Sequence, residues 1–148
     1  MVNGRAPAKP GNGSAHNHIG ADQAEGIRNG PVMVVEDDEA TREMLRYLVE
    51  SVGCSVVTAA NGLEALEHLR KGIRPCLILL DLMMPIMDGC AFDHELAADL
   101  QLSWIPTIVI TAFPERASGL TRHLSVVQKP VELDEIVSLV KQYAAYDE

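Results

Sequence analysis

The feature that most constrains this chain is an alternation, from residue 31 onward, of short aliphatic runs with segments whose apolar residues repeat at helical spacing. The runs hold four or five residues rich in Val, Ile and Leu, which favours strands over helices. Because consecutive positions are apolar, both faces of each strand must be covered. This pattern predicts a doubly wound α/β fold around a five-stranded parallel sheet. The predicted strands are 32–35, 55–59, 76–80, 107–111 and 124–128.

The segments between these runs have the pattern of amphipathic helices. Asn61 followed by Glu64 predicts an N-cap with its reciprocal acid. In the segment after the first strand, the face predicted to meet solvent consists of Arg42, Glu43, Arg46 and Glu50. The positions expected to be buried, helix by helix, are Met44, Leu45, Leu48 and Val52; Leu63, Leu66 and Leu69; Phe92, Leu96 and Leu100; and Leu133, Ile136, Val137 and Val140.

Composition divides the chain into a tail and one domain. Residues 1–30 hold six of the eleven glycines and almost no large apolar side chains, so they cannot bury enough surface to offset the entropy lost on ordering. We therefore predict a disordered tail over residues 1–30 and a single domain over residues 31–148.

The charge balance and the cysteines exclude several classes of protein. A net charge of -9 leaves no basic stripe for nucleic acid and disfavours an acidic membrane surface. No apolar run approaches the length needed to span a membrane. The three cysteines form no CxxC pair, which favours a reducing compartment. We expect a cytoplasmic protein with neither nucleic acid nor membrane as a partner.

Polar side chains follow four of the five predicted strands. Parallel strands end at one edge of their sheet, and α/β folds bind ligands at that edge. Carboxylates gathered there repel one another, and a hard divalent cation, for which Mg2+ is the best candidate, would compensate them. A carboxylate nucleophile, Mg2+, a lysine and a hydroxyl together suit phosphoryl transfer. In strand order the side chains are Glu36, Asp37 and Asp38; Asp81; Thr111; and Lys129.

Each of these residues also has a structural interpretation. Asp38 could cap the following helix, and Asp81 could begin a loop before Pro85. Thr111 could be an ordinary residue at the end of a strand, and Lys129 a surface lysine before a turn. Their convergence on one edge of the sheet favours the functional interpretation.

Together these motifs resemble the receiver domain of bacterial two-component response regulators, over residues 31–148. "VVEDD" resembles the acidic turn of that family, and "LLDLMMPIMDG" resembles its phosphoacceptor segment. The resemblance implies a flavodoxin-like fold with strand order 2-1-3-4-5. "VITA" and "QKP" match the hydroxyl and lysine positions, the latter with a cis peptide bond before Pro130. The implied roles are phosphorylation of Asp81, phosphate contacts by Thr111 and Lys129, and Mg2+ bound by Glu36, Asp37, Asp81 and the backbone carbonyl of Met83.

Two departures from the family pattern concern the output side of the domain. Val126 stands where the family typically carries an aromatic switch residue. The segment from Thr111 to Lys129 is several residues shorter than usual, which predicts a shortened or irregular fourth helix.

These features lead to two hypotheses about function. The first is a stand-alone response regulator that takes a phosphoryl group from a sensor histidine kinase or a histidine phosphotransfer protein and acts on a downstream protein target, with homodimerisation as one option. The second is a phosphorylation-independent interaction module with an altered output face. A small-molecule phosphohydrolase is disfavoured, because Met83 stands where the general acid would be needed.

The lifetime of the phosphoryl group is the last expectation. In the resembling family, the positions of Met83 and Phe113 flank the path of the hydrolytic water. Neither side chain is suited to orient water by a hydrogen bond. We therefore expect a long-lived phosphoryl group, the alternative being that both side chains only pack locally.

Overall fold

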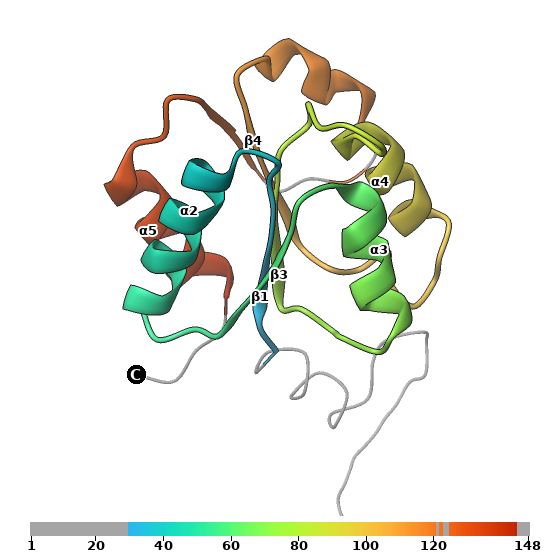
Figure 1. Ribbon diagram of the computed structural model, residues 1–148, viewed down its shortest axis with the longest axis horizontal. Coiled ribbons are helices and arrows are strands. Elements are labelled where there is room, and N and C mark those ends of the chain that lie inside the picture. The colour runs from blue at the N-terminus through green and yellow to red at the C-terminus, as the bar shows by residue number, and fades with distance from the viewer. Residues whose placement is uncertain (1–29, 121, 123–124, 145–148) are drawn as a thin grey trace, which may run out of the picture.

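The computed structural model describes residues 30–120, 122 and 125–144. It confirms a central five-stranded sheet with helices on both faces (Figure 1). The strand order is β2-β1-β3-β4-β5, and every pairing is parallel, as predicted. Most of the tail predicted over residues 1–30, and the last residues of the predicted domain, lie outside the described residues. The strands are β1 Val32–Val35, β2 Val56–Ala59, β3 Leu77–Leu80, β4 Thr107–Thr111 and β5 Ser125–Gln128.

Side-chain caps fix the starts of three helices. The carboxylate of Asp38 accepts from the Thr41 N–H at 2.9 Å, and the Asn61 side chain accepts from the Glu64 N–H at 2.9 Å. Each bond satisfies an N–H that has no partner within the helix. The predicted cap at Asn61 is thereby confirmed, and Asp88 plays the same role in the next helix. The helices are α2 Glu39–Ser51, α3 Gly62–Arg70, α4 Gly89–Ala97 and α5 Leu133–Tyr143, with a 3-10 helix, η1, at Pro114–Gly119.

Two hydrophobic layers enclose the sheet. Helices α2 and α5 cover one face, and α3 and α4 cover the other (Figure 1). Alternate residues of β1 enter opposite layers, with Val34 packing toward α2 and α5 and Met33 toward α3 and α4. This alternation follows from the period of two along a strand. Both faces of the central strands β1, β3 and β4 are therefore buried, as the apolar runs predicted, whereas the edge strands β2 and β5 are only partly buried.

Three leucines expected in the core are exposed. Leu63 lies outside the stripe of Gly62, Ala65, Leu66 and Leu69 that α3 buries. Leu100 is 89% exposed because α4 ends at Ala97, so the helical spacing no longer applies to it. Leu133 is the first residue of α5, where the buried stripe begins only one turn later.

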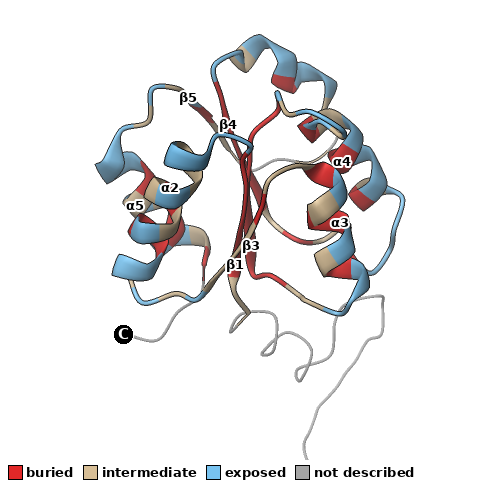
Figure 2. Cartoon of the chain, viewed as in Figure 1, coloured by how far each residue is buried: buried red, intermediate tan, exposed pale blue. Residues whose placement is uncertain are grey.

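The segment between β4 and β5 confirms the predicted shortening of the fourth helix. The six-residue η1 buries one side chain, Ala117, and its outer face is exposed (Figure 2). Ala117 joins Leu82 and Val109 in a small cluster, against which the partly buried Val126 packs. The residue that replaces the family's aromatic side chain is thus part of this small cluster.

Candidate functional site

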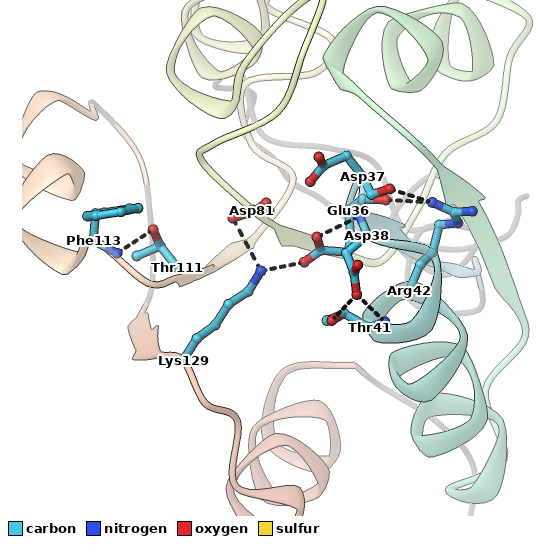
Figure 3. A network of polar contacts seen from close by, with 9 residues as sticks. All are labelled: Glu36, Asp37, Asp38, Thr41, Arg42, Asp81, Thr111, Phe113 and Lys129. Carbon is cyan, nitrogen blue, oxygen red and sulfur yellow. Dashed lines mark hydrogen bonds and ion pairs between the residues drawn. The ribbon is translucent and has the colours of Figure 1, made fainter.

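The predicted site residues meet at the C-terminal edge of the sheet (Figure 3). Glu36 follows β1, Asp81 follows β3, Thr111 ends β4 and Lys129 follows β5. Oxygen atoms of the Glu36, Asp37 and Asp81 carboxylates all lie within 4.8 Å of one another. Glu36, Asp81 and Thr111 are buried, while Asp37 is exposed. The strand ends therefore bring together the groups that the sequence predicted.

Lys129 partly neutralises this acidic cluster. Its Nζ lies 2.9 Å from Glu36 Oε1 and 3.7 Å from Asp81 Oδ1. Burial disfavours the charged ammonium, yet the hydrogen bond and charge of Glu36, together with Asp81 and Asp37, leave the pKa of Lys129 raised. The lysine is therefore held as a cation between two buried carboxylates. The peptide bond from Lys129 to Pro130 is cis, as the resemblance implied.

Asp81 is a buried carboxylate whose charge is only partly compensated. Its burial, and then the negative charge of Glu36, raise its pKa to about 6, although Lys129 and a backbone hydrogen bond from Met83 oppose the shift. A carboxylate that is difficult to ionise beside two others needs additional positive charge. The predicted Mg2+ would supply it.

Thr111 presents a hydroxyl at the same edge. Its side chain is completely buried, and Oγ1 accepts a hydrogen bond from the Phe113 N–H at 3.0 Å. An oxygen that accepts one bond can still donate its own hydrogen. The hydroxyl is therefore suited to contact an anionic oxygen placed beside Asp81.

Two glycines let the loop after Asp81 pack tightly. A Cβ on Gly89 would lie 2.5 Å from the carbonyl oxygen of Asp81, and one on Gly62 would lie 2.9 Å from that of Met87. The Gly62 N–H also donates to the Met87 carbonyl at 2.9 Å. Within this loop Ile86 has a φ of 69°, unusual for a β-branched residue. The conformation of the loop therefore depends on close backbone contacts at both glycines.

The turn between β1 and α2 is held from two sides. Asp38 caps α2, and the hydrogen bonds from Thr41 lower the pKa of its carboxyl. Its backbone N–H donates to Glu36 Oε2 at 3.0 Å. Arg42, on the helix face predicted to meet solvent, is half-buried, and its Nη1 donates to the backbone carbonyls of Glu36 and Asp37. Sequence periodicity could not reveal this contact, because the arginine bends back along its own helix.

The donor set suits a hard divalent cation. Three carboxylates from two strand ends offer oxygen atoms close enough to share one ion, and such ligands match Mg2+. Lys129 alone does not balance the charges of Glu36, Asp37 and Asp81. The residues present therefore fit Mg2+, and the contribution of the Met83 carbonyl stays a prediction.

A second buried ion pair, which the sequence did not suggest, lies at the opposite edge of the sheet. Arg122 Nη1 lies 3.4 Å from Asp93 Oδ1 and 3.2 Å from Thr107 Oγ1. Its Nε donates to the Ser103 carbonyl at 2.8 Å, and Nη2 donates to the Ile105 carbonyl. The arginine thus joins α4, the start of β4 and the segment before β5.

The fold and the C-terminal edge of its sheet define a flavodoxin-like α/β domain, with an acidic site beside a partly buried lysine and a buried hydroxyl. A model of the family described as response regulator receiver domain matches residues 32–141. The chain belongs to this family, whose members act in two-component signalling, bind Mg2+ at an acidic pocket, and interact with histidine kinases or phosphotransfer proteins.

Individual relatives agree with this assignment. The polar-differentiation response regulator DivK of Brucella anthropi is 34% identical over 119 residues, which cover 76% of this chain and 94% of DivK. The phosphorylated cyanobacterial phytochrome response regulator RcpA is 28% identical, with a TM-score of 0.64 over 77% of this chain and 90% of RcpA. The response regulator TrrA of Thermotoga maritima, in complex with Mg2+-BeF, is 26% identical, with a TM-score of 0.66 over 77% of this chain and 98% of TrrA.

The family is one of signalling receivers and not of typical enzymes. Within the residues that the structure describes, none of the helices has the length and apolar character needed to cross a membrane.

Proposed function

We propose that this protein receives a phosphoryl group on Asp81 from a phosphohistidine of a partner histidine kinase or histidine phosphotransfer protein, with Mg2+ required. The observation that carries the proposal is the convergence of buried Asp81 with Glu36 and Asp37, with Lys129 Nζ 3.7 Å from Asp81. The phosphorylated state in which RcpA was solved and the Mg2+ in the TrrA complex also support it.

The chemistry is an in-line displacement at phosphorus. A carboxylate oxygen of Asp81 forms the new P–O bond while the P–N bond of the phosphohistidine breaks. The bonding electron pair stays on the ring nitrogen, so a ring that is protonated on its other nitrogen leaves as neutral imidazole. The product is an aspartyl phosphate.

The other residues stabilise charge on the transferred group. The ammonium of Lys129 and the hydroxyl of Thr111 would each donate to a phosphoryl oxygen. Glu36, Asp37, Asp81 and the Met83 carbonyl would hold Mg2+, which when bound neutralises charge on the phosphoryl oxygens. The signal would then pass to a downstream protein target by protein contacts.

The proposal is tested by intact mass after incubation with acetyl phosphate, with and without Mg2+. We expect the parent protein to gain one phosphoryl group only when Mg2+ is present. Asp81→Asn, which keeps the shape but removes the nucleophile, should gain none. A gain of equal size in Asp81→Asn would place the phosphoryl group elsewhere and contradict the proposal.

A phosphorylation-independent interaction module is the second candidate. The short η1 and Val126 favour it, because both alter the side of the domain next to Thr111. If acetyl phosphate and a partner kinase both leave the parent protein unmodified in Mg2+, this second function becomes the better explanation.

A further inference from the structure

We infer that Arg42 is a positioning residue for the divalent-cation site. It holds the backbone of the acidic turn so that the Glu36 and Asp37 carboxylates face Asp81. This inference rests on the Mg2+ site of the proposed function. It adds to that site a residue that contacts neither the ion nor the phosphoryl group.

Arg42 makes a pair of hydrogen bonds to the backbone of the acidic turn. Its Nη1 donates to the Glu36 carbonyl at 3.0 Å and to the Asp37 carbonyl at 3.3 Å. One nitrogen thus bridges the peptide groups of the two residues whose side chains enter the cluster. Figure 3 shows Arg42 and Lys129 approaching this turn from opposite sides.

The turn that Arg42 contacts carries concentrated negative charge. Three carboxylates whose oxygens lie within 4.8 Å of one another repel, and repulsion favours a turn that opens and separates them. The Glu36 N–H donates to the Ala59 carbonyl at 3.0 Å, which holds the start of the turn. Arg42 holds its middle. Keeping the ligands in place before the ion arrives lowers the reorganisation that binding requires.

If Arg42 acted only through its charge, removing it would change the Mg2+ affinity in the opposite direction from that expected of a positioning residue. A cation near the site repels Mg2+, so removing its charge should tighten binding if charge were all that mattered. Removing a group that positions the ligands should weaken binding. The direction of the change in Mg2+ affinity therefore separates the two roles.

The experiment is calorimetric titration of Mg2+ into the metal-free protein at pH 8, for the parent, Arg42→Met and Arg42→Lys. Methionine keeps an apolar stem of good helix propensity. Lysine keeps the charge but reaches one bond less far. We expect roughly 10-fold weaker Mg2+ binding for Arg42→Met, the scale of losing an outer partner of metal ligands. Arg42→Lys should fall between this variant and the parent.

Arg46→Met is the matched control. Arg46 lies one turn further along α2 and pairs with Glu43 and Glu50, with a side chain 41% exposed. The Arg46→Met substitution removes one positive charge from the same helix, as Arg42→Met does. The Mg2+ affinity of this variant should equal that of the parent. Circular dichroism without metal establishes that each variant is folded.

The outcomes are distinct. Equal or tighter Mg2+ binding by folded Arg42→Met would overturn the positioning role while leaving the metal site intact. Absence of Mg2+ binding by the parent protein itself would overturn the metal site of the proposed function, and the inference with it.

Discussion

Two buried ion pairs lie at opposite edges of the same sheet, and they are completed in different ways. At one edge Arg122 meets Asp93 together with two carbonyls and a hydroxyl, so its guanidinium has acceptors on several sides. At the other edge Lys129 lies between Glu36 and Asp81, with Asp37 close by, so negative charge exceeds positive. The acceptors around Arg122 come from the protein itself, whereas the acidic cluster around Lys129 keeps an excess of negative charge that a bound cation would offset.

This difference separates stability from function. A buried ion pair that is fully hydrogen-bonded fixes one arrangement of the chain, and losing one partner strands a charge. A buried cluster with excess charge costs stability until a ligand completes it, which is typical of functional sites. The edge at the N-terminal ends of the strands, which holds Arg122 and Asp93, is therefore expected to be structural. The edge at their C-terminal ends, which holds Asp81 and Lys129, is expected to be reactive.

The largest expected effect comes from Arg122→Met, which removes the guanidinium that pairs with buried Asp93 and contacts two carbonyls and a hydroxyl. We expect the free energy of unfolding to fall by about 3–5 kcal/mol, measured by urea denaturation followed by circular dichroism. The proposed phosphorylation site should still bind Mg2+ in whatever fraction remains folded. A loss below about 1 kcal/mol, the scale of a surface pair, would show that this edge is not fixed by the ion pair.

Two further variants control this measurement. Adding Asp93→Asn to Arg122→Met removes the buried negative charge that has lost its guanidinium partner and should recover part of the loss. Arg70→Met breaks the exposed pair with Glu95 at 4.0 Å and should change stability by less than about 0.5 kcal/mol.

The second prediction concerns Asp81→Asn in the presence of a chelator. The pKa of Asp81 rises from 3.8 to about 6 on folding. Between these values the folded protein holds a proton that the unfolded chain has lost. The contribution of Asp81 to the free energy of unfolding is therefore fully present below pH 4 and is lost as the pH rises through 6. At pH 8 the variant should be more stable than the parent by on the order of 2 kcal/mol.

Urea denaturation at pH 8 and pH 4 measures this effect, and the advantage of the variant should vanish at pH 4. At pH 8, millimolar Mg2+ should stabilise the parent more than Asp81→Asn. The difference in the free energy of unfolding between the two proteins should therefore become smaller. An advantage of Asp81→Asn that is the same at pH 4 and pH 8 would contradict the charge excess assigned to this edge.

The smallest expected effect concerns the lifetime of the phosphoryl group. Met83 and Phe113 each lie two residues beyond a residue of the proposed site and are 43% and 42% exposed, so both can accept polar replacements. We expect Met83→Asn and Phe113→Gln each to speed dephosphorylation roughly threefold, about 0.7 kcal/mol in barrier height. The decay of the phosphorylated mass with time measures the rate.

Leu100→Gln, at a site 89% exposed and outside the predicted site, is the control and should leave the decay unchanged. Unchanged decay in both Met83→Asn and Phe113→Gln would mean that these side chains only pack locally.

The sequence predicted what depends on local patterns. The strands were located within about one residue because a buried parallel strand is a continuous apolar run bounded by polar residues. Glu36, Asp81, Thr111 and Lys129 could be assigned to one edge because parallel strands end together. Asp38 fitted two interpretations, and its hydrogen bonds with Thr41 support the cap.

The features that escaped prediction are not encoded in the period of a helix or a strand. Arg122 and Asp93 lie 29 positions apart and join segments whose proximity no local pattern encodes. Arg42 has the spacing of a solvent-facing residue, and only the path of the acidic turn brings two carbonyls within its reach. Leu100 has helical spacing but follows the end of its helix.

The short η1 also has a consequence for local opening. With one buried side chain, it has little apolar area to protect its backbone from solvent, so its amide hydrogens should exchange with deuterium sooner than those of β4 and β5 beside it. The same weak anchoring makes residues 114–119 a suitable place to insert a peptide tag or a fluorescent reporter. Because Thr111 lies three residues before η1, such a reporter would stand next to the proposed phosphorylation site without occupying it.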